Sequence, residues 1–346
     1  MGYATETVTS RYKRDPLAQS RVRCGPSGFG SVWVMTRPLS GTQYELRHGD
    51  YTATIASIGA SIRELKHRGR DLVVPFGADE IRPAYRGASL APWPNRIADG
   101  QYTFAGAPQL VPLTEPERGN ALHGLAVWLD FGAIEQTPSR VTLAATIVAQ
   151  TGYPHRVDVE VAFELDDDGL HSTITGLNSG TDAAPWGTGP HPYLVAGPGR
   201  VDDWTLLLPA AEVLEVTPDR LLPVAQASVT TAGGDQGEGV WDFREARPIG
   251  GVFVDHAFTA LSRDAAGRTA VEVRTADGSG VAISWDTACP WVQVHTADKP
   301  EQPEISRIGL AVEPMTCPPD AFNSGTDLVV LEPGASHTAG WTIFAL

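Results

Sequence analysis

The feature of this sequence that most constrains its fold is a strict alternation of apolar and polar side chains. In VDVEVAFEL (residues 157–165) the apolar side chains occupy every second position, and acidic side chains take most of the positions between them. Successive side chains of a β-strand point to opposite faces, so this period predicts a half-buried strand. Weaker versions recur at 51–65, 141–149 and 270–286, often broken by glycine. No long helical period or blade-length repeat competes, so the sequence predicts an all-β protein, a large antiparallel β-sandwich.

The N-terminal segment differs from the remainder of the chain in charge. Residues 1–40 carry six basic and two acidic side chains, whereas the 346-residue chain has a net charge of -15. A change of composition of this kind is typical of a domain boundary. We therefore expect an N-terminal extension or strap over residues 1–40 and one β-sandwich domain over residues 41–346. The segments discussed below as chemically active all lie in the domain.

Composition disfavours several kinds of partner. The excess of acid, 41 Asp and Glu against 26 Lys and Arg, argues against a nucleic-acid surface, which needs a basic face. No apolar run approaches the length that spans a membrane, and no secretory signal is visible. The cysteines Cys24, Cys289 and Cys317 form no CxxC pair. We expect reduced thiols in a cytoplasmic protein, which acts as a monomer or homodimer on a small molecule.

Two titratable residues stand directly before prolines. His191 lies in GTGPHPYL (187–194), and Glu313 follows an apolar run and precedes Pro314. A residue before proline is biased to extended backbone, so both side chains are held in segments that cannot be helical. His191 is then either part of a turn or a rigid proton donor or acceptor, with few backbone hydrogen bonds. A charged residue on a buried strand is rare unless it is paired or functional, which singles out Glu313.

Other polar residues have both structural and functional interpretations. Asn95 and Arg96 follow Pro94, His123 precedes a glycine, and Asp255 ends an apolar run. Taken singly, the arginine could pair with an acid, the histidine could be a core residue and the aspartate a cap. No HExxH, GxSxG or strand-linked GxGxxG is present, so no metal and no nucleotide cofactor is expected.

Taken in chain order, these segments resemble the aldose 1-epimerase (mutarotase) family. The resemblance rests on PNRI at 94–97, HG at 123–124, HPY at 191–193, VDHAF at 254–258 and EP…PDAFN at 313–323, and it covers roughly residues 41–346. It implies a galactose-mutarotase type of β-sandwich that exchanges the α and β anomers of a free sugar without a cofactor. It further implies roles for seven residues: His191 as general acid, Glu313 as general base, and Asn95, Arg96, His123, Asp255 and Gln293 as sugar-binding residues.

The chain departs from the family pattern at several positions. Leu194 and Val195 follow the HPY motif, and His295 stands where the family has a tyrosine. Trp93 and Trp186 precede two of the motifs, and we expect their rings to suit the apolar face of a pyranose. APWPNRI resembles a bacterial branch of the family in which some members are linked to sulfosugar breakdown. These changes bear on the choice of sugar and leave the acid–base chemistry intact.

Anomer exchange requires a base for the O1 proton and an acid for the ring oxygen. We expect an ionised Glu313 and a proton-bearing His191 on opposite sides of a bound sugar, with pKa values shifted by their surroundings. Three alternatives stay open: a carbohydrate-binding sandwich without catalysis, an epimerase of the same fold acting on hexose 6-phosphates, and a purely structural sandwich. The acidity of the domain disfavours the phosphorylated substrate.

Overall fold

The computed structural model describes residues 37–346, which form one unit. Residues 1–36, most of the predicted extension and Cys24 with it, lie outside the described residues. Ser40, near the end of that predicted extension, already belongs to this unit, because its backbone N–H donates to the carbonyl of Ala78 at 3.0 Å. Cys289 and Cys317 are buried free thiols. Among residues 37–346 no helix has the length and apolar character needed to cross a membrane.

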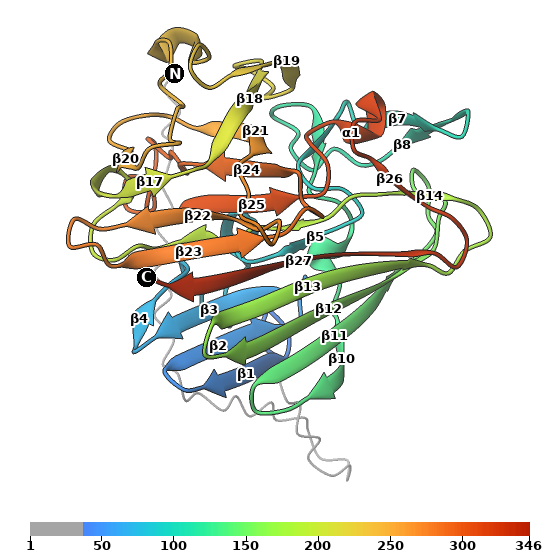
Figure 1. The fold of residues 1–346 in the computed structure, drawn as a ribbon. Coiled ribbons are helices and arrows are strands. Elements are labelled where there is room, and N and C mark those ends of the chain that lie inside the picture. Colours follow the sequence, from blue (N-terminus) through green and yellow to red (C-terminus); the bar gives the residue numbers. More distant parts are fainter. Residues whose placement is uncertain (1–36) are drawn as a thin grey trace, which may run out of the picture. The chain divides into compact units, whose positions relative to one another are not determined.

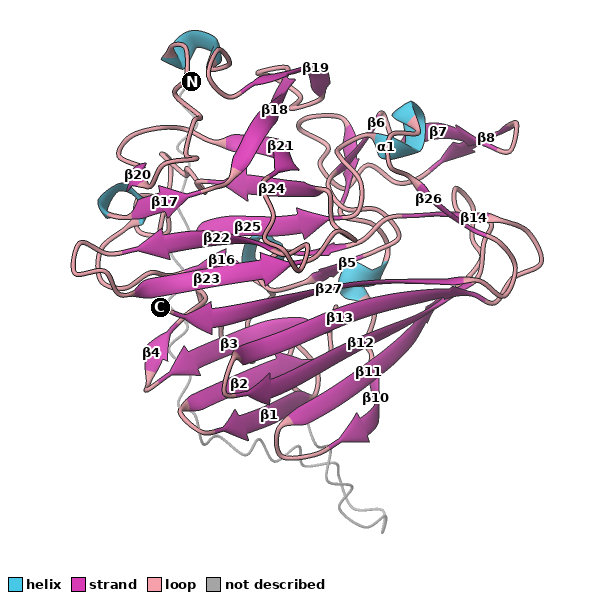
Figure 2. Ribbon diagram, viewed as in Figure 1, coloured by secondary structure: helices cyan, strands magenta, loops and turns pink. Residues whose placement is uncertain are grey.

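Antiparallel β-sheet dominates the described residues (Figure 2), which confirms the predicted fold class. The largest sheet has nine strands in the spatial order β10 (Gly132–Gln136), β11 (Arg140–Ile147), β12 (Val157–Asp166), β13 (Gly169–Asn178), β27 (Ser336–Ala345), β23 (Gly280–Trp285), β22 (Thr269–Arg274), β17 (Thr205–Leu207) and β20 (Arg247–Pro248). In Figure 1 the strands β10 to β13 and β27 run side by side across the lower half of the view.

Two further sheets and four strand pairs complete the β-structure. The six-stranded sheet has the order β16 (Tyr193–Leu194), β25 (Leu310–Met315), β24 (Trp291–His295), β21 (Asp255–Leu261), β18 (Ala210–Val216) and β19 (Pro223–Ser228). The four-stranded sheet contains β1 (Gln43–His48), β2 (Tyr51–Ala56), β3 (Ser61–His67) and β4 (Arg70–Asp71). The pairs are β5 (Ser89–Leu90) with β15 (Gly189–Pro190), β6 (Arg96–Ala98) with β9 (Asn120–Leu122), β7 (Gln101–Phe104) with β8 (Ala107–Leu110), and β14 (Ala184–Trp186) with β26 (Val329–Leu331).

Between residues 37 and 346, helical structure is confined to short turns between strands. The α-helix α1 spans Ala321–Ser324, and the 3-10 turns η1 to η4 span Pro83–Tyr85, Ala126–Trp128, Val201–Asp203 and Gly234–Gln236. These turns connect strands and form no layer of their own. The sequence contains no long 3.6-residue apolar period, so no helix here could bury a stripe against the sheets.

A contiguous core unites the three larger sheets, and β12 shows why the sequence folds this way. Its residues alternate between buried and more exposed along the whole strand, as the sequence predicted. The apolar face of β12 joins a cluster that also contains Leu46 of the four-stranded sheet and Phe258 of the six-stranded sheet. The second face of the six-stranded sheet is therefore free to carry polar residues.

Candidate active site

The predicted site residues on β21, β24 and β25 share one face of the six-stranded sheet. Asp255 pairs with His295 in the strand register, and Gln293 pairs with Glu313. The alternate residues Val294 and Val312 point into the main core. Because side chains alternate along a strand, an apolar core on one face leaves the polar side chains together on the other.

The GTGPHPYL segment carries His191 to this face by a close backbone approach. A Cβ atom on Gly189 would lie 2.6 Å from the carbonyl oxygen of Pro314, so only glycine fits beside the strand that carries Glu313. The His191 N–H donates to Ala88 O at 3.0 Å, and its carbonyl accepts from Gly87 N at 2.8 Å. The expectation of few backbone hydrogen bonds was wrong, because the turn that precedes β5 provides both partners.

His191 and Glu313 are direct neighbours. The His191 Nε2 lies 3.4 Å from the Glu313 Oε1, and the two side chains are 6% and 2% exposed. The sequence argument placed acid and base on opposite sides of a sugar, and this was wrong. The two groups stand side by side, on the same wall of the site.

Burial changes the proton affinities of this pair in opposite directions. Burial, with a contribution from the charge of Asp255, raises the pKa of Glu313 well above its ordinary value. Burial, followed by the charge of His295, lowers the pKa of His191 to about 3. The pKa of Glu313 therefore lies above that of His191, so a single proton on the pair resides on Glu313 and not on His191, where the sequence argument placed it.

Asn95 and His123 hold each other in strained backbone conformations. Their φ angles are 56° and 64°, in the left-handed region that costs energy for residues other than glycine. The His123 N–H donates to Asn95 O at 2.8 Å, and the Asn95 N–H donates to the His123 Nδ1 at 3.2 Å. Because Nδ1 accepts, the proton of the neutral imidazole is on Nε2. His123 therefore presents a hydrogen-bond donor to the site, as a sugar oxygen requires.

The position of the His123 proton on Nε2 also bears on metal binding. Ligand atoms of His123, His191 and Glu313 lie within 4.8 Å of one another, a spacing that an ion could span. An imidazole nitrogen that carries a proton has no lone pair for a metal, and the other nitrogen of His123 is occupied by Asn95. The arrangement fits a hydrogen-bonding site better than a metal centre.

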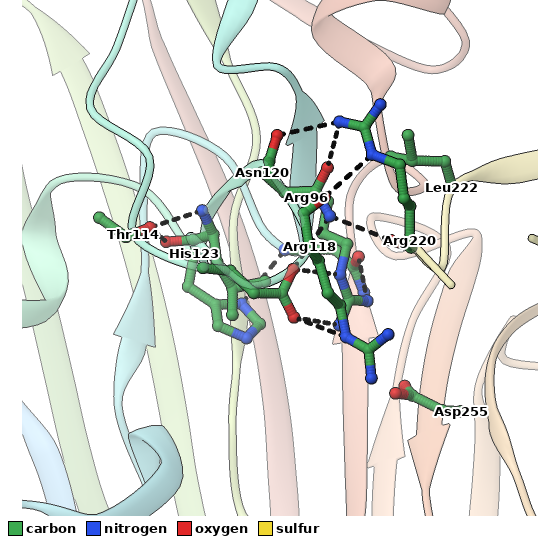
Figure 3. A network of polar contacts seen from close by, with 12 residues as sticks. Arg96, Thr114, Arg118, Asn120, His123, Arg220, Leu222 and Asp255 are labelled. Atoms are coloured by element: carbon green, nitrogen blue, oxygen red, sulfur yellow. Dashed lines mark hydrogen bonds and ion pairs between the residues drawn. The ribbon is translucent and has the colours of Figure 1, made fainter. Parts of the chain in front are cut away.

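Arg96 is fixed by a buried glutamate that the sequence argument did not single out. Its Nε and Nη2 donate to the two carboxylate oxygens of Glu115 at 2.9 Å each, and both side chains are 8% exposed. Asn120 donates to the same carboxylate at 3.0 Å, and Arg118 lies 3.3 Å from it. Figure 3 shows this network, with Asp255 on the far side of the arginines. Burial acts to lower the pKa of Arg96, but the Glu115 hydrogen bonds together with the charges of the surrounding carboxylates outweigh it and the pKa is raised.

Asp255 and Gln293 complete the set of seven predicted residues. The Gln293 Nε2 donates to the Asp255 Oδ1 at 2.7 Å. Burial acts to raise the pKa of Asp255, but the charges of His295 and Arg96 prevail and the pKa is lowered, so Asp255 is ionised. The structure thus brings all seven side chains together, from residues spread between positions 95 and 313.

The two tryptophans expected to face the sugar are core residues. Trp186 is fully buried, and Trp93 is 3% exposed and packs its ring against Phe322. Tyr85, on η1, is instead an aromatic residue beside the two histidines. Its ring centroid lies 4.7 Å from that of His123 and 6.2 Å from that of His191, and its backbone φ is 55°. A lone tyrosine in a turn carries no sequence signal for this role.

The sequence of residues 42–343 matches the family model described as aldose 1-epimerase. The chain belongs to the aldose 1-epimerase family. It is 36% identical over 310 residues to the uncharacterized protein YihR of Escherichia coli, covering 88% of this chain and 94% of that protein. It is 26% identical over 253 residues to an E. coli protein named aldose 1-epimerase, with 66% and 70% of the two chains covered.

Solved structures of the family share the fold. The crystal structure of the GalM/aldose epimerase homologue from C. elegans has a TM-score of 0.75 to this chain, with 19% identity and 88% and 98% of the two chains covered. The crystal structure of a putative aldose 1-epimerase from E. coli K12 has a TM-score of 0.73, with 22% identity and 88% and 99% of the two chains covered. At this identity the likeness establishes the galactose-mutarotase type of β-sandwich and leaves the reaction and the sugar to be argued from the site.

Proposed function

We propose that this protein is an aldose 1-epimerase that interconverts the α and β anomers of a free aldose by general acid–base catalysis. The observation that supports the proposal most strongly is the buried pair of His191 and Glu313, with 3.4 Å between Nε2 and Oε1. The two oxygens that exchange protons in mutarotation, O1 and the ring oxygen, are bonded to the same carbon. Adjacent acid and base groups therefore suit this reaction.

The single proton of the pair is sufficient for the chemistry. When it passes from Glu313 to His191, the pair becomes a carboxylate and an imidazolium without a change of total charge. Glu313 then removes the proton of the O1 hydroxyl while His191 protonates the ring oxygen. The bond between C1 and the ring oxygen breaks, and the aldehyde forms. After rotation about the C1–C2 bond the same transfers run in reverse, and both groups regain their initial state.

The remaining residues of the site provide directed hydrogen bonds. His123 offers Nε2–H, Arg96 offers guanidinium N–H groups, and Asp255 offers an ionised acceptor. Such fixed donors and acceptors orient sugar hydroxyls and hold C1 against the acid–base pair. Arg96 is already paired with Glu115, so its charge is not available for a phosphate group, which favours the free sugar over a hexose 6-phosphate.

The proposal is tested by Glu313→Gln, assayed with freshly dissolved single anomers by polarimetry or NMR exchange. Gln keeps the shape of the side chain but cannot take a proton, so kcat should fall by at least about 100-fold. Glu160→Gln is the matched control, because Glu160 is an exposed glutamate on β12. Near wild-type mutarotation by a folded Glu313→Gln protein on every sugar accepted would refute the assignment.

The same assay separates the alternatives. A panel of free aldoses, sulfosugars and hexose 6-phosphates, each compared with the uncatalysed rate, identifies the substrate class. Binding measured by calorimetry without any acceleration would indicate a carbohydrate-binding module. Acceleration confined to phosphorylated sugars would indicate the 6-phosphate epimerase.

A further inference from the structure

His295 lies in the site beside a residue proposed to bind the sugar. It pairs with Asp255 in the register of β24 and β21, and both side chains point to the face that carries Glu313. The His295 Nδ1 is 3.6 Å from the Asp255 Oδ2, and the side chains are 22% and 12% exposed. The family resemblance assigned His295 no role, since a tyrosine is usual there.

The bonding of the two oxygens of Asp255 is asymmetric. Oδ1 accepts a hydrogen bond from Gln293 at 2.7 Å. Oδ2 receives no hydrogen bond from the described residues, and the buried His295 Nδ1 likewise has no hydrogen-bond partner among them. A separation of 3.6 Å is too long for a hydrogen bond, but it is short enough for electrostatic attraction in a buried site. His295 is therefore the group placed to fix the second oxygen of Asp255.

The other charged and titratable groups around His295 make this role specific. Arg96 on β6 also attracts Asp255, but Glu115 holds it in a bidentate pair. His191 and His123 feel the charge of His295 as a repulsion. Glu313 is engaged with His191. Among these groups Asp255 is the one that His295 attracts most directly.

We propose that His295 is a positioning residue that holds the Asp255 carboxylate oriented toward the sugar. The inference rests on the proposed function, because it takes Asp255 as a sugar contact. It assigns His295 to substrate affinity and not to proton transfer, which His191 and Glu313 perform. A change at His295 should therefore act on KM more than on kcat.

The test compares two substitutions that differ in one donor. His295→Phe keeps an aromatic ring but removes Nδ1, and KM should rise about tenfold, the cost of one lost polar interaction, with kcat within about threefold. His295→Asn keeps an N–H group near the position of Nδ1 and should restore KM to within about threefold of wild type. His48→Phe is the control, because His48 pairs with Asp167 at the surface, away from the site.

A double-substitution cycle shows whether His295 acts through Asp255. In an Asp255→Asn background, His295→Phe should raise KM by less than about twofold, because the partner is already gone. Fully additive effects would overturn the proposal, as would an unchanged KM or a loss confined to kcat in the single variant. If His295→Phe does not fold, His295→Ala assayed with added imidazole replaces it, and failure of imidazole to lower KM would overturn the proposal.

Failure of this inference can be distinguished from failure of the proposed function. If the wild-type protein accelerates mutarotation of no sugar, the proposed function fails. The same variants are then compared by the Kd for a bound sugar in place of KM. An unchanged Kd in His295→Phe would overturn the role of His295 independently of any activity.

Discussion

Replacing Glu115 by glutamine tests how the buried network positions Arg96. The carboxylate receives four donor groups: two from Arg96, one from Asn120 and one from Arg118. A glutamine amide has one acceptor oxygen, and its NH₂ group would face donors that it cannot accept. At least one charged donor is then left unpaired in a site where Arg96 is 8% exposed.

The structure predicts a large loss of stability for Glu115→Gln. Breaking a buried ion pair by removing one partner costs about 3–5 kcal/mol, since the remaining charge stays buried. With roughly 1.5 °C lost per kcal/mol for a unit as large as residues 37–346, the Tm of Glu115→Gln should fall by at least roughly 4 °C. Because Arg96 would lose its bidentate anchor, KM for the sugar should rise while the pH dependence of kcat keeps its shape.

The measurement is thermal unfolding together with steady-state mutarotation. Glu135→Gln serves as control, because Glu135 pairs with Arg140 at 3.1 Å with side chains 49% and 41% exposed. Such exposed pairs contribute about 0–1 kcal/mol. The reasoning is refuted if both variants lose equally little stability. A stability loss without any change in KM would show that Glu115 serves the fold and not the orientation of Arg96 toward sugar.

Two further predictions concern pH and backbone geometry. The rate should have an acid limb near the lowered pKa of His191, about 3, where a second proton removes the base. Its alkaline limb should lie above the ordinary pKa of Glu313, where loss of the proton removes the acid. An acid limb near 6.5, the ordinary pKa of a histidine, in the kcat profile would contradict this. Gly124→Ala should lose stability and activity, because its Cβ would lie 2.2 Å from Ala91 O beside His123, whereas Gly106→Ala, with the same φ of 79° and open space, should lose only about 1–2 kcal/mol and stay active. Equal losses of activity in the two folded variants would contradict the role of Gly124.

The strand pattern could be predicted from the sequence because alternation along a strand is a local property. The candidate residues could be predicted because their motifs follow one another in a recognisable order along the chain. The alternation in residues 157–165 depends only on which side of a strand each side chain takes, and β12 confirms it. The short polar motifs identified seven residues that the structure brings together. The strict order of those motifs made the resemblance informative, although each motif alone had a structural interpretation.

The tertiary structure decided the features that depend on distance across the chain. Glu115 anchors Arg96, Tyr85 lies beside His123, and the two tryptophans are buried, because loop conformation and core volume determine which side chains reach the site. A single proton on the pair of His191 and Glu313 lies on Glu313, because burial of that carboxyl from water raises its pKa above that of His191, and burial is a property of the folded surroundings. Residue type alone determined that an acid and a base were available; only the packing of β16, β24 and β25 determined which of them holds the proton.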